Sequence, residues 1–140
     1  MVVRKLMANE LEMALELYCD SFLKEKKNSN LDLLGEVFGM FLEDELIGMV
    51  QFDFIHHIFE DTKILYVNGF CIRDSYRNQG YGDKLLKWCL AFANEHHVDV
   101  IQLTSNKTRV YAHKLYEKNG FETVDTVIFK KDIKKESTLL

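Results

Sequence analysis

The chain has 140 residues, of which 47% are hydrophobic, and its formal net charge is −4 at pH 7. A chain of this length is expected to form one domain that buries roughly two-thirds of its unfolded surface, without needing a disulfide or a metal. The negative charge argues against general nucleic-acid binding, which depends on a basic face, and suits a cationic substrate better.

The first half of the chain is expected to contain two helices and four strands. Residues 2–7 are predicted as a strand, and apolar side chains recur at helical spacing from residue 11 to residue 22. Asn9 and Glu12 have the spacing of a capping box at the start of that helix. A second, short helix is expected at residues 31–34. Three strands are then predicted at residues 37–42, 46–58 and 64–72, the first two joined as a hairpin.

The second half of the chain alternates helices and strands. An amphipathic helix is predicted over residues 82–95 and a strand over residues 98–104. A strand-helix-strand unit of this kind is almost always right-handed and leaves strands 64–72 and 98–104 parallel in one sheet. A further helix is expected over residues 108–119, and residues 121–130 alternate as a closing strand.

Composition also indicates the cellular compartment of the protein. The three cysteines, Cys19, Cys71 and Cys89, lie far apart without a CxxC pair, which suits a reducing compartment. No apolar run approaches the roughly 18 residues of a membrane span, and the N-terminus has no hydrophobic signal core. We therefore expect a soluble cytoplasmic protein without a membrane partner. One domain is expected over residues 1–131, with a charged and frayed tail over residues 132–140.

The run Arg77-Asn78-Gln79-Gly80-Tyr81-Gly82 follows a predicted strand and opens a predicted helix. Its glycines let the backbone approach a ligand, and the first turn of the helix presents unpaired N–H groups with partial positive charge. The run therefore predicts an anion site that suits a phosphate. It is not a P-loop, because Asp83 and Lys84 follow, and Leu85 replaces the third glycine of a dinucleotide fingerprint. A plain tight turn explains these residues alone equally well.

Two further motifs accompany this run at defined spacing. They are Leu103-Thr104-Ser105-Asn106 and Ala112-x-x-x-Tyr116-Glu117-x-Asn119-Gly120-Phe121. Together with Arg77-x-x-Gly80-x-Gly82 they resemble the GCN5-related N-acetyltransferases, and the order of elements agrees over nearly the whole chain. The resemblance implies an α/β (α+β) fold with a mixed, largely antiparallel central sheet flanked by helices. It also implies that a splayed pair of parallel strands forms the acetyl-CoA cleft.

The same resemblance implies an enzyme that moves an acetyl group directly from acetyl-CoA to a primary amine of a small molecule or peptide, without a metal. The pyrophosphate of the coenzyme would lie on the backbone of the glycine loop. The pantetheine arm would pair with two splayed strands, at residues 70–72 and 103–105, and a bulge near Gly69 would separate them. The expected cofactor-binding residues are Phe70, Cys71, Ile72, Arg77, Asn78, Gln79, Gly80, Tyr81, Gly82, Asp83, Asn106 and Arg109.

The resemblance also assigns catalytic roles. Tyr116 would protonate the departing thiolate of the coenzyme, since a phenol has a pKa of about 10 and a thiol about 8.5. Many relatives place a glutamate on the fourth strand as general base, but Asn68 occupies the matching position and cannot accept the proton. Asp53, acting through a water, is a candidate base, and Glu36 is a candidate substrate residue in the same cleft. The simpler interpretations are that Tyr116 is an ordinary core tyrosine and that Asp53 and Glu36 are ordinary solvent-facing carboxylates.

Several alternatives stay open at this point. Cys71 is a possible covalent acetyl acceptor, although a small buried strand residue is the simpler interpretation. The missing carboxylate at Asn68 is compatible with a non-catalytic acyl-CoA-binding sensor or interaction module. A nucleotide-binding domain using the glycine loop is a third hypothesis. Acidic residues 43–45, with Asp53, hint at a polyamine, an aminoglycoside or a basic peptide as acceptor. A homodimer is compatible with the sequence.

Overall fold

A computed structural model describes residues 1–25 and 36–134 of the chain. Within these residues, five strands form one sheet in the order β1-β2-β3-β4-β5. The elements, in chain order, are β1 (Val2–Lys5), η1 (Ala8–Glu10), α1 (Leu11–Phe22), β2 (Glu36–Leu42), β3 (Glu45–His57), β4 (Thr62–Ile72), η2 (Asp74–Tyr76), α2 (Tyr81–Glu95), β5 (Val100–Leu103) and α3 (Val110–Lys118). The short helix predicted at residues 31–34 lies outside the described residues.

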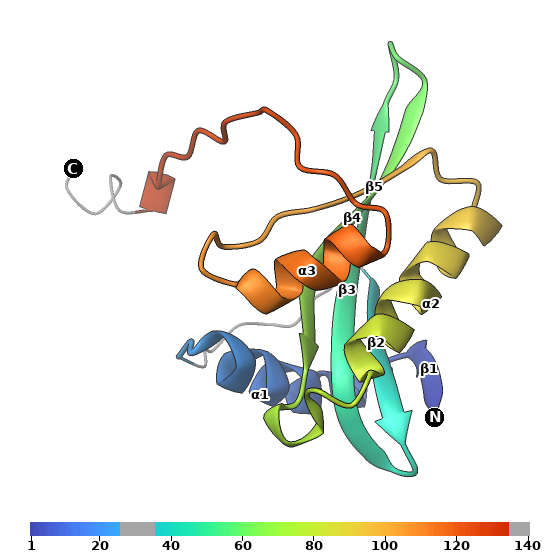
Figure 1. Cartoon of the computed structure of the whole chain (residues 1–140), viewed down its shortest axis with the longest axis vertical. Coiled ribbons are helices and arrows are strands. Elements are labelled where there is room, and N and C mark those ends of the chain that lie inside the picture. Colours follow the sequence, from blue (N-terminus) through green and yellow to red (C-terminus); the bar gives the residue numbers. More distant parts are fainter. Residues whose placement is uncertain (26–35, 135–140) are drawn as a thin grey trace.

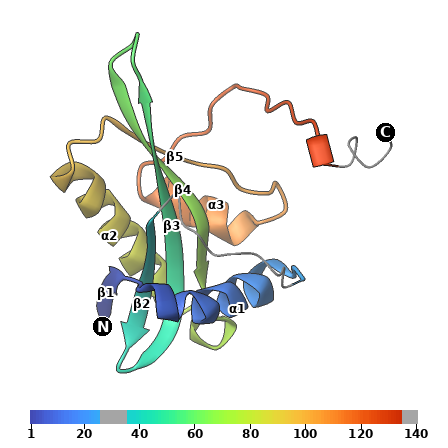
Figure 2. The same ribbon diagram turned by 180° about the vertical axis from the view of Figure 1, so that it is seen from behind.

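The sheet is mixed and largely antiparallel. Strands β1 to β4 pair antiparallel with their neighbours, whereas β4 and β5 pair in parallel. Helix α1 covers one face of the sheet, and α2 and α3 cover the other (Figure 1, Figure 2). The predicted α/β fold class, the hairpin of β2 and β3 and the parallel crossover through α2 are therefore confirmed.

Each face of the sheet has its own hydrophobic core. On the α1 face, Leu11, Ala14 and Leu17 pack against Met49 and Cys71 of the strands. On the opposite face, α2 supplies the following buried residues to a core that it shares with β2, β3 and β4: Leu85, Leu86, Cys89 and Ala93. The middle of β2 and the first part of β3, residues 37–41 and 46–50, are continuously apolar and buried, because both faces of the sheet are covered there. None of the helices in the described residues is both long and apolar enough to cross a membrane.

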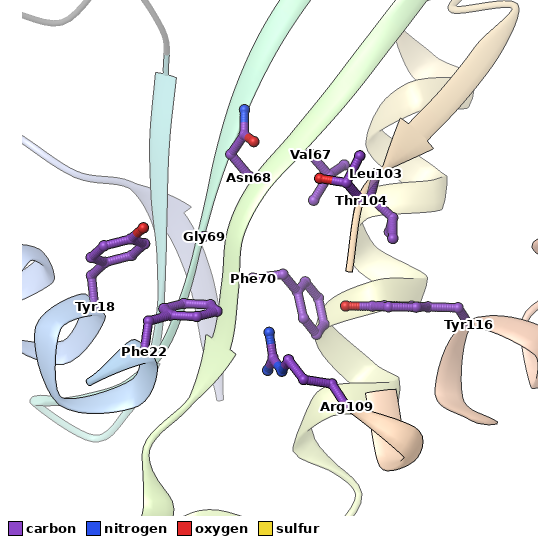
Figure 3. A pocket seen from close by; sticks show the side chains of 10 residues that line it. All are labelled: Tyr18, Phe22, Val67, Asn68, Gly69, Phe70, Leu103, Thr104, Arg109 and Tyr116. Carbon is purple, nitrogen blue, oxygen red and sulfur yellow. The ribbon is translucent and has the colours of Figure 1, made fainter. Parts of the chain in front are cut away.

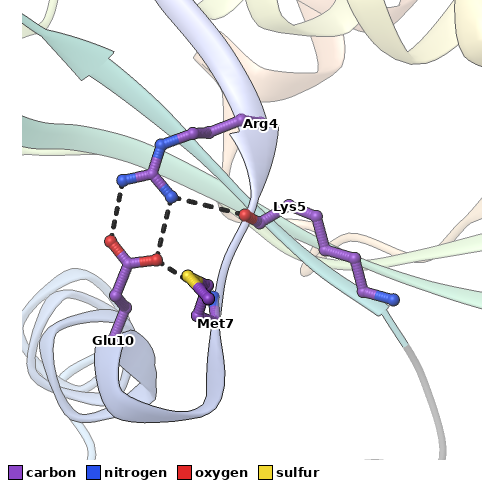
Figure 4. Close-up of polar contacts among 4 residues, drawn as sticks. All are labelled: Arg4, Lys5, Met7 and Glu10. Atoms are coloured by element: carbon purple, nitrogen blue, oxygen red, sulfur yellow. Dashed lines mark hydrogen bonds and ion pairs between the residues drawn. The ribbon is translucent and has the colours of Figure 1, made fainter.

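The start of the first helix differs in detail from the predicted capping box. Glu10, rather than Glu12, accepts a hydrogen bond from the backbone N–H of Met7 at 3.0 Å (Figure 4). The same carboxylate receives two hydrogen bonds from the guanidinium of Arg4, at 2.8 and 2.7 Å. These hydrogen bonds, with Arg4 the largest cause, lower the pKa of Glu10 to about 2. The edge strand β1 is thereby attached to the turn that opens α1.

The closing strand predicted over residues 121–130 is wrong for this structure. No strand forms there, and residues 122–134 are all exposed. The segment instead runs away from the body of the protein after α3 (Figure 1, Figure 2). Alternating apolar residues indicate a segment that is able to form a strand, but a strand also needs a partner edge to accept its backbone hydrogen bonds. The alternation alone does not specify that partner.

Candidate functional site

Strands β4 and β5 pair over only part of their length. Their parallel register runs from Ile64 opposite Val100 to Val67 opposite Leu103 and then stops. Just beyond this point, Gly69 has a positive φ of 62°. On its other side, the register between β4 and β3 shifts by one residue between Asn68 and Cys71, which is the signature of a bulge. The predicted bulge near Gly69 and the predicted splay of the parallel strands are confirmed.

A cavity of about 150 Å³ lies where the two strands separate. Its walls come from α1, β4, β5 and the start and last turn of α3 (Figure 3). The lining residues are Tyr18, Phe22, Val67, Asn68, Gly69, Phe70, Leu103, Thr104, Arg109 and Tyr116. Helix α1 lies on one face of the sheet and α3 on the other, so the cavity is bounded by residues from both faces.

Tyr116 faces this cavity from α3. Its side chain is buried, with 7% exposed, and its ring makes an edge contact with Phe70 at a centroid distance of 6.2 Å. The hydroxyl points toward Phe70 in Figure 3, and no described residue makes a hydrogen bond with it. Burial raises the pKa of Tyr116, although the nearby guanidinium of Arg109 opposes that effect. The phenol is therefore neutral at physiological pH, and its proton is not donated to any described residue.

Arg109 supplies positive charge to the cavity. It precedes the first residue of α3, and its guanidinium lies over the ring of Phe22 at 4.8 Å from the centroid. This contact joins the end of α1 to the start of α3. None of the described residues that line the cavity is acidic, so the guanidinium has no carboxylate beside it there. A ligand in the cavity therefore lies beside a positive charge that no acidic lining residue neutralises.

The carboxylate of Asp53 reaches the cavity only through Asn68. The side-chain N–H of Asn68 donates to Asp53 Oδ2 at 2.9 Å, and Gln51 donates to the same oxygen at 3.2 Å. Asn68 lines the cavity, whereas Asp53 does not. The two residues lie on the neighbouring strands β4 and β3. The candidate base is consequently one amide group away from the cavity.

The glycine loop offers a row of free backbone donors. No described residue accepts a hydrogen bond from the backbone N–H groups of residues 78–83, and the first bond of α2 runs from Lys84 N to Gly80 O at 3.2 Å. Asn78 and Gly80 have positive φ angles of 61° and 87°. These left-handed residues turn consecutive amides toward solvent ahead of the positive end of α2. The loop is thus open to an anion.

Two charged side chains hold this loop in place. Arg77 donates from Nε to the carbonyl of Ile72 at 2.9 Å and pairs with Asp74 at 3.2 Å. Asp83, in the first turn of α2, accepts hydrogen bonds from Lys87 at 2.6 Å and from Asn119 at 3.0 Å. These bonds, that of Lys87 first, lower the pKa of Asp83 to about 2. Asp83 thereby connects the glycine loop to the end of the helix that carries Tyr116.

A second cavity, of about 390 Å³, lies beside the glycine loop and the end of α1. Arg73, Asp74 and Arg77 line it from the loop side, and Asp20 and Ser21 line it from α1. Its two arginines are balanced by two aspartates, so its lining has no excess charge. Tyr116 and the other residues of the first cavity are not part of it.

Other predicted site residues lie outside the first cavity. Asn106 uses its side-chain oxygen to accept bonds from the N–H and hydroxyl of Thr108, which builds the turn before α3. Cys71 packs in the core on the α1 face, where burial raises the pKa of its thiol. Glu36 pairs with Lys5 at 3.3 Å and does not line the cavity. Among the described residues, no group of three or more potential metal-binding side chains occurs.

Sequence reasoning did not identify several cavity residues. Tyr18 and Phe22 were predicted only as members of an apolar helix face, yet both line the cavity from α1. Their rings contact each other at a centroid distance of 4.8 Å. By contrast, Thr104 lies in the segment 103–105 that was expected to face the pantetheine arm, and it does line the cavity. Its neighbour Ser105 carries a buried hydroxyl without a hydrogen-bond partner among the described residues. Helical periodicity reports which face is buried, but it does not distinguish a core wall from a cavity wall.

Comparisons with known proteins agree with this architecture. A profile of the Acetyltransferase (GNAT) family matches residues 4–121. No sequence match was found among proteins with curated functions. A ribosomal-protein-alanine N-acetyltransferase from Brucella melitensis superposes with a TM-score of 0.79 and 15% identity, over 95% of this chain and 100% of that one.

Two further solved structures share the fold at low sequence identity. A transcriptional regulator from Bacillus halodurans has a TM-score of 0.80 and 21% identity, covering 94% of this chain and 99% of its own. A predicted acetyltransferase from Clostridium acetobutylicum, solved with acetyl-CoA, has a TM-score of 0.73 and 15% identity, covering 93% and 95%. At these identities the likeness concerns the fold.

Proposed function

The chain belongs to the Acetyltransferase (GNAT) family, and we propose that it transfers an acetyl group directly from acetyl-CoA to a primary amine of a small molecule or peptide. The observation that carries this proposal is the position of Tyr116. Its unpaired hydroxyl faces the cavity between the separated strands β4 and β5. Asp83 and Asn119 connect the same helix region to the open glycine loop at 3.0 Å.

The described residues fit acetyl-CoA at both ends of the proposed cleft. The free amides of residues 78–83 suit its pyrophosphate, because consecutive N–H groups at a helix start bind anions. Beyond Val67 and Leu103 the facing edges of β4 and β5 have no strand partner, so they are available to an extended pantetheine arm. The buried, unpartnered hydroxyl of Ser105 is a further polar group on that edge. When bound, acetyl-CoA supplies the activated acetyl thioester.

Tyr116 acts as the general acid in this proposal. Its raised pKa keeps the phenol protonated over the physiological range. The absence of a described hydrogen-bond partner leaves the O–H free to donate to a thiolate leaving group. Packing of the ring against Phe70 and Phe121, at 6.2 and 5.9 Å between centroids, fixes the direction of the hydroxyl. Tyr116 thus holds one proton at the place where the leaving group would need it.

Removal of the proton from the acceptor involves a different set of residues. A free alkyl ammonium has a pKa of about 10.4, so deprotonation at pH 7 costs roughly 4.6 kcal/mol. The uncompensated guanidinium of Arg109 lowers the pKa of an ammonium bound in the same cavity, because like charges disfavour each other. Asp53 then accepts the proton through a water or through movement of Asn68. Glu36, on the neighbouring strand β2, is retained as a candidate contact for the acceptor.

The acceptor itself is not expected to bind at the acidic turn between β2 and β3. Glu45, the first residue of β3 after that turn, pairs with Arg73 at 3.9 Å and accepts a hydrogen bond from the hydroxyl of Tyr76 at 2.5 Å. Neither the turn nor Glu45 lines the cavity. The aromatic rings of Tyr18 and Phe22 are instead the walls that an acceptor would meet on the α1 side.

Free thiols at Cys19, Cys71 and Cys89 support a cytoplasmic location for the reaction.

A panel of amines tests the proposal directly. The purified protein is incubated with acetyl-CoA and polyamines, aminoglycosides, amino acids or short peptides, and release of the free CoA thiol is followed with time. We expect acceptor-dependent thiol release with at least one class of primary amine. Binding of acetyl-CoA and of ATP is measured in parallel by calorimetry. Preference for ATP over acetyl-CoA would contradict the proposal.

One observation favours a second candidate function. The side-chain N–H of Asn68 donates to Asp53 at 2.9 Å, and none of the described residues that line the cavity carries a carboxylate. An acyl-CoA sensor without acetyltransferase activity would keep the coenzyme cleft and need no base. Tight acetyl-CoA binding without thiol release across the whole amine panel would support the sensor over the enzyme.

A further inference from the structure

Arg109 differs from the other arginines of the chain because no carboxylate lies beside it. The chain has four arginines, and Arg4, Arg73 and Arg77 lie 2.7, 3.9 and 3.2 Å from a carboxylate. Among the described residues, none forms an ion pair with Arg109 or accepts a hydrogen bond from its side chain, and the guanidinium instead stacks on the ring of Phe22. A guanidinium stacked on a ring keeps the N–H groups at its edges free, so Arg109 has donors available for a ligand.

The surroundings of this guanidinium are neutral. Figure 3 shows the half-buried side chain of Arg109 pointing into the cavity, between the rings of Phe22 and Tyr116. Arg109 is the one charged residue among the described residues that line the cavity. A charge that is partly removed from water attracts an opposite charge more strongly than an exposed one does. Although the net charge of the whole chain is −4, the cavity therefore favours a ligand that brings a negative charge to the start of α3.

The coenzyme does not supply this negative charge in the proposed complex. We place the pyrophosphate of acetyl-CoA at residues 78–83, and none of these residues lines the cavity. The pantetheine arm and the acetyl thioester, which reach the cavity in that complex, are uncharged. The anion beside Arg109 therefore comes from the acceptor. Arg109 is thereby assigned to the acceptor, whereas the sequence resemblance grouped it with the coenzyme-binding residues.

The other end of the cavity suits the amino group of the same molecule. Asn68 lies at that end in Figure 3 and uses its side-chain N–H to donate to Asp53 at 2.9 Å. The amide oxygen of Asn68 has no hydrogen-bond partner among the described residues. An ammonium group has donors only, and a carboxylate has acceptors only. The free oxygen of Asn68 and the free N–H groups of Arg109 therefore match the two ends of an amino acid.

We propose that the acceptor is an amino acid, with its carboxylate bound by Arg109 and its amino group beside Asn68; this assignment rests on the proposed acetyl transfer. A carboxylate is favoured over a phosphate because it has a single negative charge and matches two N–H groups of one guanidinium. The rings of Tyr18 and Phe22, with centroids 4.8 Å apart, suit an apolar side chain. The guanidinium still lowers the pKa of the bound ammonium, because it offsets the charge of the neighbouring carboxylate.

Acceptors that differ only in the carboxylate give the first test. The twenty standard amino acids are screened by thiol release with saturating acetyl-CoA, and the best acceptor is compared with its amide and its decarboxylated amine. We expect kcat/KM to fall roughly 100-fold without the carboxylate, because the N–H groups of Arg109 are then left unpaired. The amide is the stricter control, since its amino group loses a proton more easily than that of the acid. Equal acetylation of either analogue, or acetylation of polyamines but of no amino acid, would overturn the inference.

Variants of Arg109 give the second test. Arg109→Gln should raise KM for the amino acid roughly 100-fold, with a smaller change in kcat and little change for the decarboxylated amine. Arg109→Lys keeps the charge but loses the paired N–H groups, so it should recover only part of the loss. Lys107→Gln removes an exposed charge from the same turn and should behave as wild type. Equal losses for the amino acid and the amine in Arg109→Gln would overturn the role in binding the carboxylate. The comparison of acceptors on the wild-type protein stays decisive if a variant does not fold.

Binding without turnover separates this inference from the proposed function. Calorimetry in the presence of CoA, which carries no acetyl group, compares the amino acid with its amide on the wild type and on Arg109→Gln. Binding that depends on Arg109, together with an absence of thiol release, would contradict acetyl transfer and support the carboxylate site. Thiol release from amines with and without a carboxylate at equal rates would support acetyl transfer and overturn the carboxylate site. An absence of amino-acid binding would overturn that site in either case.

Discussion

Asn68 separates the carboxylate of Asp53 from the cavity, with its side-chain N–H donating to Asp53 Oδ2 at 2.9 Å. The neutral amide of Asn68 therefore lies between the negative charge of Asp53 and the cavity where we propose that the reaction occurs. Gln51 donates to the same oxygen at 3.2 Å, so the carboxylate is oriented by two amide groups. How the acceptor amine loses its proton therefore depends on this pair of residues.

We predict that Asp53→Asn lowers kcat/KM for the amine roughly 10- to 100-fold, because general bases contribute about 100-fold or more when they act directly. The substitution keeps the shape of the side chain. Affinity for acetyl-CoA should not change, since Asp53 does not line the cavity. Asp61→Asn, at an exposed carboxylate in the turn between β3 and β4, is the control. Equal kinetics for the two variants would exclude Asp53 as the base.

The converse substitution, Asn68→Asp, puts a carboxylate into the cavity wall. A carboxylate at position 68 faces the cavity directly, without an intervening amide, so it can accept a proton from a bound amine. We expect a higher kcat/KM for the amine, by about 10-fold, with the gain largest below pH 8. The pH profile of steady-state kinetics measures this effect. An unchanged profile would mean that proton removal does not occur beside Asn68.

Tyr116→Phe should lower kcat roughly 100-fold while leaving the dissociation constant of acetyl-CoA nearly unchanged. The ring contacts with Phe70 and Phe121 persist, and the lost hydroxyl has no described protein partner, so stability should change by less than about 0.5 kcal/mol. Tyr111→Phe is the matched control, since Tyr111 lies on the same helix and is 86% exposed. Single-turnover kinetics and calorimetry make the comparison. A fully active Tyr116→Phe protein would remove the general-acid role.

The sequence was informative wherever a feature depends on local chain chemistry. The glycine pair at 80 and 82 specified an open loop at a helix start, and the structure has one there. Gly69 indicated a bulge because an isolated glycine in a strand pattern tolerates the required positive φ. Periodicity predicted β3, β4, α2 and α3 because their buried faces repeat with a strand or helix period.

Features that depend on residues far apart in the chain were harder to predict. The Asp53–Asn68 hydrogen bond joins two strands and depends on their register, which the pattern of either strand alone does not specify. The contact of the Arg109 guanidinium with the Phe22 ring joins α3 to α1 across 87 positions of sequence, so no local motif predicts it. Residues 121–130 alternate like a strand, but whether they pair depends on a partner edge outside their own sequence.

Gly80→Ala should weaken acetyl-CoA binding by distorting the loop. At a φ of 87° any side chain is strained, although no atom lies within 4 Å of the added Cβ. Gly120 has the same character, with a φ of 86° and open space, which makes Gly120→Ala the matched control. Both substitutions should cost about 1 kcal/mol of stability, but only Gly80→Ala should raise the dissociation constant of acetyl-CoA. Equal affinities in the two variants would argue against coenzyme binding at this loop.

Asp83→Asn should destabilise the protein in a pH-dependent way. The pKa of Asp83 is about 2, depressed from 3.8 by bonds from Lys87 and Asn119. A depressed carboxyl pKa contributes stability that is fully present above pH 4 and is lost as pH falls toward 2, because the unfolded state then binds the proton more readily. Urea unfolding of the wild type and the variant should therefore differ at pH 6 and converge near pH 2. Asp44→Asn, at an exposed turn, is the control and should show no such convergence. A stability difference for Asp83→Asn that stays constant between pH 6 and pH 2 would mean that its carboxylate does not connect α2 to the end of α3.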